Sequence, residues 1–387
     1  MITLNKISSF PGIILLLCLL VSCKDQKEHQ NNFKKKNDPI TEEIKFYKGA
    51  DLSYVNEMLD CGGVFYDSLG KEKDPYHIFK QNGANLIRLR LWHNPDWTDY
   101  SDFEDVKRSI KKAKSNKLKV LLDFHYSDTW ADPHKQQIPK AWRKYINDTD
   151  TLGDLLYNYT FNTLKKLSLE NLTPDIVQIG NETNAMILQE EKHVDTIDWK
   201  RNAYLLNKGI KAVRDFSEIK GENIEVMLHI AQPENALWWF KEAKANGISN
   251  YDWMGLSYYP KWSVYKLDHV GEAFSSLINT YNKKLMIVET AYPFTLEDND
   301  EAGNILGTDA LIEGYPATEQ GQLNYLTELS KIIFNSGGKG IVYWEPAWIS
   351  TECSTLWGKV SHWDNATLFD YNNRPNLGMK FFNSTFK

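Results

Sequence analysis

Short hydrophobic runs separated by longer amphipathic segments recur along the chain from about residue 47 onward. The runs are rich in β-branched and aromatic residues, which favour strands. Eight such runs occur, at residues 47–52, 86–92, 119–125, 175–180, 224–229, 253–259, 285–289 and 340–344. Eight is the number of parallel strands that closes a (β/α)8 barrel, so the pattern predicts an α/β fold of the TIM-barrel type.

The segments between the predicted strands have helical periodicity. Apolar residues between 103 and 113 recur at spacings of three and four, with Lys and Glu on the other face and Ser101 or Asp102 placed to cap the helix. The stretches 204–213 and 273–278 repeat this signal. Repetition of strand, helix and strand predicts parallel strands joined by right-handed crossovers.

The first part of the chain has a different character. Residues 11–21 form an apolar run, preceded by Lys6, that is too short for a confident membrane span and is typical of a secretory signal. The following Ser22-Cys23 completes a segment that resembles the bacterial lipobox, whose cysteine carries the lipid. We therefore predict a lipoprotein signal peptide at residues 1–22 and lipidation of Cys23; an ordinary signal peptide with an incidental cysteine is the alternative.

Residues 24–45 are rich in Lys, Asp, Glu, Gln and Asn and contain few apolar residues. This composition predicts a solvated tether over residues 23–45 rather than folded structure. Lys24-Asp25 resembles the surface-export signal of bacterial lipoproteins, which favours an outer-membrane, surface-exposed location. Contact with the membrane is expected through the lipid anchor only. Residues 46–387 contain no low-complexity linker and are predicted to form a single catalytic domain.

Composition narrows the class of ligand. A net charge of -6, from 45 Lys and Arg against 51 Asp and Glu, gives no basic footprint for a phosphate backbone, so nucleic acid is not an expected partner. Aromatic residues make up 13% of the chain, including 13 tryptophans. Each of these can fill the core, but their flat faces also suit the apolar faces of sugar rings.

Two predicted strands end in a carboxylate. Glu182 follows the fourth run after Gly180-Asn181, and Glu289 ends the seventh. Reacting groups of such barrels sit at the carboxyl ends of strands. One glutamate there is equally compatible with a structural ion pair, but two that converge suit a retaining glycosidase, whose carboxyls lie about 5–5.5 Å apart. We predict Glu182 as general acid/base and Glu289 as nucleophile.

Cationic and amide groups lie beside these carboxylates in the sequence. Arg90 is the predicted cation that keeps Glu289 ionised. Arg88 and Arg90 alternate with leucines and therefore point to the same side of the sheet, either both into the barrel end or both outward. Asn181, next to the acid, is suited to hold a sugar hydroxyl.

Seven short segments stand out between residues 49 and 348: GADLS (49–53), RLRLW (88–92), DFHYSDTWADP (123–133), QIGNE (178–182), SYYP (257–260), VETAY (288–292) and YWEPAW (343–348). Together they resemble glycoside hydrolase family 53, the endo-β-1,4-galactanases that cleave the galactan of type I arabinogalactan. The resemblance covers about residues 49–382. It implies a retaining mechanism, endo cleavage and a polysaccharide substrate, with the acid/base and nucleophile after the fourth and seventh strands.

The resemblance also implies a set of residues around the reacting sugar. They are Arg90, Trp92, His125, Asn181, His229, Tyr258 and Trp344. For the two histidines the alternative is a core imidazole satisfied by the backbone, and for Trp344 it is core packing. Trp348 and Trp363 are weaker stacking candidates in the final loop.

The acidic segment 297–304 supplies oxygens at alternate positions, which suits Ca²⁺. The predicted ligands are Asp298, Asp300, the Ala302 carbonyl and Asn304, and bacterial members of the resembled family carry calcium in this loop. A solvated acidic loop is the alternative. No organic cofactor is expected.

Two cysteines remain in the predicted domain. Cys61 follows the first predicted strand and Cys353 follows the eighth, and these strands become neighbours when a barrel closes. A disulfide between them and two independent buried thiols are both open.

Residue chemistry alone leaves two other functions open. A different retaining barrel glycanase, such as a mannanase or a xylanase, would use the same two glutamates, since only the resemblance selects galactan. A non-catalytic, glycan-binding surface lipoprotein is the other alternative. The presence of both carboxylates argues against it.

Overall fold

The computed structural model describes residues 45–190, 192–355, 358–359 and 361–386. The predicted signal peptide, Cys23 and nearly all of the predicted tether lie outside the described residues. No helix within the described part has the length and apolar character needed to cross a membrane.

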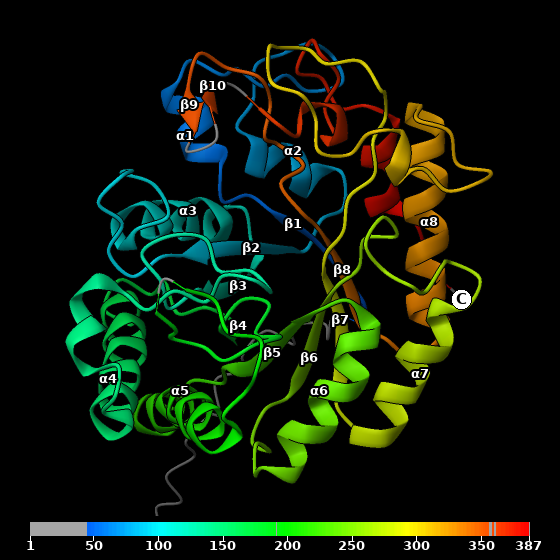
Figure 1. Cartoon of the computed structure of the whole chain (residues 1–387). Helices are drawn as coiled ribbons and strands as arrows, with labels where there is room; N and C mark the ends of the chain where they lie inside the picture. Colours follow the sequence, from blue (N-terminus) through cyan, green and yellow to red (C-terminus); the bar gives the residue numbers. More distant parts are fainter. Residues whose placement is uncertain (1–44, 191, 356–357, 360, 387) are drawn as a thin grey trace, which may run out of the picture. The chain divides into compact units, whose positions relative to one another are not determined.

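Eight parallel strands close into a barrel in chain order, with β1 paired to both β2 and β8 (Figure 1). This confirms the (β/α)8 prediction and all eight predicted strands. The strands are β1 (Tyr47–Asp51), β2 (Leu86–Leu91), β3 (Lys119–Phe124), β4 (Ile176–Ile179), β5 (Glu225–Ala231), β6 (Trp253–Ser257), β7 (Lys284–Glu289) and β8 (Gly340–Tyr343).

Helices connect the strands on the outside of the barrel (Figure 1). They are α1 (Val55–Asp60), α2 (Pro75–Gln81), α3 (Phe103–Ser115), α4 (Thr149–Ser168), α5 (Trp199–Lys220), α6 (Pro233–Ala245), α7 (Val270–Tyr281) and α8 (Glu319–Asn335). Short 3-10 helices and a hairpin complete the described elements: η1 (Lys140–Tyr145), η2 (Thr308–Ala310), η3 (Asp364–Ala366), η4 (Leu377–Asn383), β9 (Ser354–Thr355) and β10 (Gly358–Lys359).

Helix α3 shows how local sequence fixes these elements. The Asp102 side chain accepts a hydrogen bond from the Asp105 backbone nitrogen, so Asp102 is the N-cap, one of the two caps predicted. Val106, Ile110 and Ala113 are buried. Lysines occupy the last turn, where the helix dipole stabilises positive charge. The apolar spacing therefore packs this helix on the barrel.

The inside of the barrel is filled in layers. One layer is apolar and consists of Leu86, Leu121, Ile176, Met227, Trp253, Met286, Val288 and Val342 in one buried cluster. Two residues further along β2 and β3, on the same face, the buried residues become Arg88 and Asp123. Strand alternation therefore places charged side chains at the carboxyl end of the barrel, next to an apolar layer.

Strand β7 contains an irregularity that changes which side chain faces inward. Leu256 of β6 pairs with Ile287, but the next residue, Ser257, pairs with Glu289. Val288 is the extra residue, and it belongs to the inner cluster. Such a bulge re-aims the residue after it. Glu289 consequently points into the barrel mouth, although strict alternation from Val288 would turn it outward.

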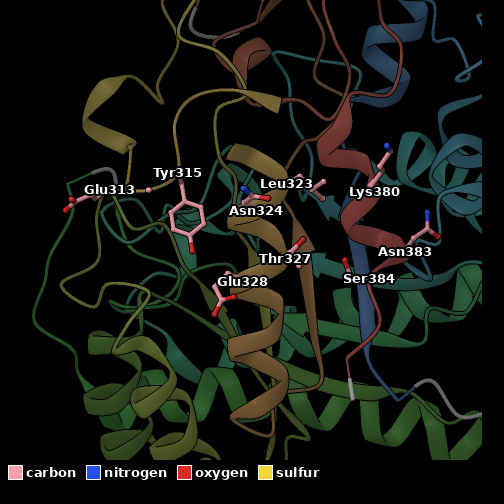
Figure 2. A pocket seen from close by; sticks show the side chains of 10 residues that line it. Glu313, Tyr315, Leu323, Asn324, Thr327, Glu328, Lys380, Asn383 and Ser384 are labelled. Atoms are coloured by element: carbon pink, nitrogen blue, oxygen red, sulfur yellow. The ribbon is translucent and has the colours of Figure 1, made fainter. Parts of the chain in front are cut away.

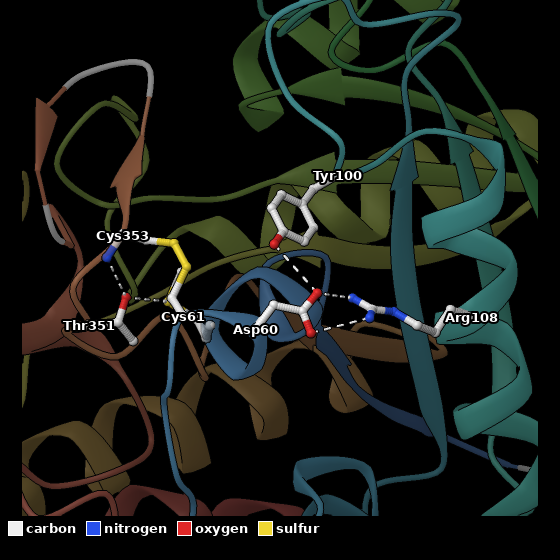
Figure 3. The surroundings of a disulfide bond; sticks show 7 residues. Asp60, Cys61, Tyr100, Arg108, Thr351 and Cys353 are labelled. Atoms are coloured by element: carbon white, nitrogen blue, oxygen red, sulfur yellow. Dashed lines mark hydrogen bonds and ion pairs between the residues drawn. A yellow bond between two sulfur atoms is a disulfide. The ribbon is translucent and has the colours of Figure 1, made fainter.

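A disulfide joins the loops after β1 and β8. Cys61, which ends α1, pairs with Cys353, and their Cα atoms are 5.6 Å apart (Figure 3). The Cys353 backbone nitrogen donates to Thr351, and the neighbouring Asp60 forms an ion pair with Arg108. The sequence left a disulfide and two independent thiols open, and the structure decides for the disulfide, because closing the barrel brings these loops together.

Candidate active site

The turn after β4 presents Glu182 to the barrel mouth. Gly180 and Glu182 both have left-handed backbone conformations, with φ of 82° and 43°. A non-glycine residue with positive φ is strained unless its surroundings hold it. Here the Gln136 side chain donates to the carbonyls of Asn181 and Glu182, and the Glu182 backbone nitrogen donates to Nδ1 of His229.

The two predicted catalytic carboxyls meet. Carboxylate oxygens of Glu182 and Glu289 and a ring nitrogen of His229 all lie within 4.8 Å of one another. Residues that are 107 positions apart in the chain are therefore brought together by β4 and β7. The expected convergence of the two carboxyls is present in the fold.

A cleft of about 1220 Å³ opens above this pair. It is larger than the ~300–1,000 Å³ usual for a small-molecule pocket. Aromatic side chains form much of its wall: Trp130, Trp238, Tyr259, Trp262, Trp344, Trp348 and Trp363. Flat apolar faces beside hydroxyl-binding groups are what a sugar chain requires.

Arg88 is the cation that holds Glu289. Its Nη2 lies 2.9 Å from Glu289 Oε1 and 2.8 Å from Asp123 Oδ2, and its Nη1 lies 2.7 Å from Asp51 Oδ2. Nη2 also donates to Asn181 Oδ1 at 2.7 Å. All of these side chains are buried. One guanidinium therefore connects the ends of four strands with the loop that carries the acid.

The prediction that Arg90 serves Glu289 is wrong. Arg90 does point inward, as Arg88 does, but its Nη1 lies 3.2 Å from Glu345 Oε1. Its guanidinium stacks over the rings of Trp130, Trp92 and Tyr54 at 4.1, 4.7 and 4.8 Å. Arg90 is two residues further along β2, about 6–7 Å beyond Arg88, so it reaches the loop after β8 instead of the end of β7.

Burial raises the pKa of Glu182 to about 7. The negative charges of Asp132 and Asp123 act in the same direction, whereas Arg88 and a hydrogen bond from Ser257 lower the pKa. Ser257 Oγ donates to Glu182 Oε1 at 2.5 Å. A carboxyl with a pKa near neutrality can hold a proton and release it, as a general acid/base must.

Burial also raises the pKa of Glu289 well above its ordinary value, against the influence of Arg88, and the nearby Glu182 adds to the rise. Two buried carboxyls this close share a proton near neutral pH, because each ionisation opposes the other. The ion pair with Arg88 stabilises the negative charge on Glu289. Glu182 contacts a neutral hydroxyl instead of a cation, so these contacts favour the proton on Glu182.

Four of the seven residues predicted to surround the sugar line the cleft. They are Arg90, His125, Asn181 and Trp344. His125 accepts a hydrogen bond from the Ala131 backbone nitrogen at Nδ1, and its Nε2 lies 3.1 Å from Asp123. Burial lowers its pKa, which favours the neutral imidazole.

The other three lie behind the cleft wall. Trp92 lies under Arg90, and Nε2 of His229 lies 2.9 Å from Ser257 Oγ. The Tyr258 hydroxyl donates to the Tyr265 carbonyl, and its ring packs on Phe274 of α7. Tyr258 is thus a correction: side chains alternate along the chain after β6, so the next residue, Tyr259, faces the cleft instead.

Sequence reasoning missed several residues of the site. Asp51 and Asp123 hold Arg88, and Ser257 holds the acid. Burial raises the pKa of Glu345 well above its usual value, with Asp51 adding to this effect. A signal was available, since all four are polar residues within or just after hydrophobic strands, as Glu289 is.

The weaker stacking candidates Trp348 and Trp363 both line the cleft. The rings of Trp344 and Trp363 lie 4.7 Å apart and nearly perpendicular, while Trp348 stacks on Tyr54 at 4.1 Å. The final loop therefore contributes an aromatic wall of several tryptophans.

The predicted calcium loop lies against the loop after β8. Asn304 Nδ2 donates to Asp298 Oδ1 at 2.6 Å and to Asp364 Oδ1 at 2.8 Å. Asp300 accepts from the Ala302 and Ser361 backbone nitrogens. Burial raises the pKa of Asp364, and the charge of Asp300 adds to the rise. Rotating the Asn304 amide would present an oxygen between carboxylates, a donor set that fits Ca²⁺.

A second hollow, of about 840 Å³, lies beside α8 and η4 (Figure 2). Its walls include Glu313, Tyr315, Glu328 and Lys380. None of the predicted site residues lines it. The predicted catalytic pair, Glu182 and Glu289, lines the larger cleft instead.

Comparison with known proteins agrees with this geometry. The family model for glycosyl hydrolase family 53 matches residues 47–382. An arabinogalactan endo-β-1,4-galactanase of Cellvibrio japonicus is 54% identical, over 88% of this chain and 90% of that protein. An endo-β-1,4-galactanase of Bacillus subtilis is 34% identical, over 87% of this chain and 85% of that protein.

Solved structures give the same result. The family 53 catalytic domain of Ignisphaera aggregans superposes with a TM-score of 0.81 and 33% identity, over 90% of this chain and 98% of that one. Xylanase B of Clostridium stercorarium, at a TM-score of 0.52 and 15% identity over 86% and 99% of the two chains, shares only the fold. From the family model and these relatives, the chain belongs to glycosyl hydrolase family 53.

Proposed function

We propose that this protein is an endo-acting, retaining β-1,4-galactan hydrolase. The observation that carries the proposal is the pair of buried carboxyls, Glu182 and Glu289, within 4.8 Å at the floor of an aromatic cleft. A separation of about 5–5.5 Å fits double displacement, whereas inverting enzymes need about 6.5–9.5 Å to admit a water between the groups.

In the first step Glu289 attacks the anomeric carbon while Glu182 donates its proton to the glycosidic oxygen. The carbon–oxygen bond of the linkage breaks, the leaving sugar departs as an alcohol, and an ester joins the remaining glycan to Glu289. In the second step Glu182, now ionised, takes a proton from water, whose oxygen attacks the same carbon. The ester breaks, and both carboxyls return to their starting states.

The surrounding groups support this division of labour. The ion pair with Arg88 favours the ionised form of Glu289 and orients its carboxylate for attack. Asn181 Nδ2 donates one hydrogen to the Ala131 carbonyl, and its second hydrogen is placed for a sugar hydroxyl. A hydrogen bond to the hydroxyl beside the reacting carbon strengthens in the transition state.

The cleft supports endo cleavage. Its volume of about 1220 Å³ and its several tryptophans, including Trp238 on α6 and Trp262 in the loop after β6, can hold several consecutive sugars. Both of these tryptophans are about half exposed, at 49% and 47%. Exposed stacking faces along a long open cleft let an enzyme bind within a chain instead of at its end.

Galactan is the proposed substrate because the relatives that match most of the chain carry it in their names. The xylanase neighbour supports only the shared barrel, so a xylanase activity has no specific support. A non-catalytic glycan binder has no need for two converging carboxyls, one of which has a pKa near neutrality.

We also propose that the enzyme is a secreted, surface-exposed lipoprotein of the outer membrane and that the loop 298–304, together with Asp364, binds Ca²⁺. The first rests on the sequence around Cys23. The second rests on the oxygen donors that converge between the loops after β7 and β8. A bound cation would offset the repulsion among these carboxylates and tie the two loops together.

Product analysis on β-1,4-galactan, mannan, xylan and arabinan tests the main proposal. We expect galactan alone to be cut, internally, with the new reducing end released first as the β anomer, as followed by proton NMR. Replacing Glu289 with Ala removes the nucleophile and should lower kcat about 10³-fold or more. Glu313→Ala, an exposed glutamate in the hollow of Figure 2, is the matched control and should be unaffected.

An active Glu289→Ala variant would reject the mechanism. First release of the α anomer would reject retention. Cleavage of another glycan but not galactan would reject the substrate.

Ser257→Ala tests the role of Glu182 through the pH profile. Glu182 must be protonated to act as the acid, so activity falls as pH rises through its pKa of about 7. The Ser257 hydroxyl stabilises the ionised form, so its loss raises the pKa and moves the alkaline limb of kcat/KM to higher pH. Ser257→Thr retains a hydroxyl and should keep the original limb. A limb that stays in place in Ser257→Ala would show that Glu182 is not the titrating acid.

Chelation tests the calcium site. EDTA should lower the melting temperature, since a ligand held at about 100 times Kd stabilises by about 2.7 kcal/mol, and added Ca²⁺ should restore it. Asp298→Asn should weaken this dependence. An unchanged melting temperature after chelation counts against calcium in this loop.

Lipid labelling tests the anchor. In cells given radiolabelled palmitate, the chain should be labelled and recovered with membranes, and Cys23→Ser should lose both properties. Cys18→Ser, within the predicted signal peptide, is the matched control. Label that persists in Cys23→Ser would place the anchor elsewhere.

A further inference from the structure

Three metal-ligating side chains gather on the wall of the cleft, apart from the catalytic pair. One ligand atom from each of His134, His193 and Asp195 lies within 4.8 Å of the other two. His193 Nε2 is 2.9 Å from Asp195 Oδ1, and the two imidazole rings are 5.8 Å apart, edge to face. His134 and Asp195 line the cleft. The proposed hydrolysis uses none of the three.

Backbone hydrogen bonds place His134 at the tip of a tight turn. Asp132 and Lys135 exchange backbone hydrogen bonds of 2.9 and 3.1 Å across it. The Asp132 carboxylate accepts the His134 backbone nitrogen at 2.8 Å. The main chain that carries this histidine is therefore fixed before any ligand arrives.

The loop that carries His193 and Asp195 is stitched to this turn. Gln189 forms a parallel β-bridge with Gln137. The Gln189 backbone nitrogen donates to the Gln136 carbonyl at 2.7 Å, and the Gln189 carbonyl accepts from the Ile138 backbone nitrogen at 2.8 Å. The Gln189 side chain also accepts a hydrogen bond of 2.7 Å from the backbone nitrogen of Val194, which lies between His193 and Asp195 in the chain. The three groups thus face one another because of main-chain geometry.

The two ends of the group differ in freedom. The His193 side chain is 20% exposed, and its Nδ1 is buried with no hydrogen-bond partner among the described residues, while the Asp195 side chain is 89% exposed. A metal ion at Nε2 fixes the ring proton on Nδ1 and replaces the His193–Asp195 contact with two coordination bonds. The exposed Asp195 carboxylate can rotate inward to complete the set of metal ligands.

We propose that His134, His193 and Asp195 bind a borderline divalent transition-metal ion, with Zn²⁺ as the physiological candidate. Two imidazole nitrogens and one carboxylate oxygen suit Zn²⁺, whereas Ca²⁺ takes oxygen ligands only. Zinc–nitrogen bonds of about 2.0–2.1 Å require the ligand atoms to close to about 3.3 Å. The exposed Asp195 side chain and rotation of His134 supply this movement.

Three protein ligands would leave a fourth position open, and two of the three, His134 and Asp195, line the cleft. Water or a hydroxyl of a bound glycan can occupy it. The same loop carries Ala131, whose carbonyl holds the Asn181 side chain. Zinc would therefore tie together the loops after β3 and β4 that form this wall, and it would change KM for a glycan more than kcat.

Zinc binding to the tag-free, Ca²⁺-saturated protein tests the site by titration calorimetry and metal analysis after dialysis. We expect a single Zn²⁺ per chain, with affinity lowered at least about tenfold in His134→Ala and in His193→Ala. Binding should also weaken at about pH 5.5, where protons compete for imidazole. His269→Ala is the matched control, since His269 is exposed beside Asp268 and Glu272 but belongs to no such trio.

Each outcome decides the question. Equal Zn²⁺ affinity in wild type and His134→Ala, or an equal loss in His269→Ala, overturns the site. A far-ultraviolet circular dichroism spectrum and melting temperature like those of wild type show that the exposed variants fold. This binding measurement is independent of the proposed hydrolysis, so failure of one does not imply failure of the other. A Zn²⁺-dependent change in galactan KM that disappears in His134→Ala is expected where hydrolysis is present.

Discussion

The structure depends on one buried cation, Arg88, and the three carboxylates around it. Asp51, Asp123 and Glu289 contact its guanidinium from β1, β3 and β7 at 2.7 to 2.9 Å. Charges out of water are costly unless paired and hydrogen-bonded, and breaking a buried pair costs about 3–5 kcal/mol. The ion pairs with Arg88 therefore connect the ends of β1, β3 and β7, and they position the proposed nucleophile, Glu289.

From this constraint the same side chain acquires two roles. Glu182 and Glu289 are both buried, and burial raises the pKa of each. The two carboxyls differ in the side chains that contact them. Arg88 contacts Glu289, while the neutral hydroxyl of Ser257 contacts Glu182. The contacts therefore favour one carboxyl as the acid and the other as the nucleophile before substrate enters.

Predictions from the sequence succeeded where a residue's type and its place in a strand carry the information. The eight strands, the common face of Arg88 and Arg90, and the convergence of the two glutamates are all present. The structure also settled two questions that the sequence left open, since both arginines point inward and Cys61 is bonded to Cys353. Choices between near neighbours failed. The sequence favoured Arg90 over Arg88 because a strand pattern gives the face on which a side chain lies but not its position along the barrel axis. It favoured Tyr258 over Tyr259 because the pattern does not show which side chain faces inward once the strand has ended.

The sequence by itself determined the barrel and the chemical groups at its mouth, since hydrophobic periodicity and strand-end polarity are local properties of the chain. Only the tertiary structure decided which groups touch. The bulge at Val288 turns Glu289 inward. Backbone hydrogen bonds between Gln189 and the segment after β3 bring together two histidines and an aspartate that follow no common sequence motif. The physical reason is that strand pairing and loop contacts join residues far apart in the chain, where no sequence period reaches.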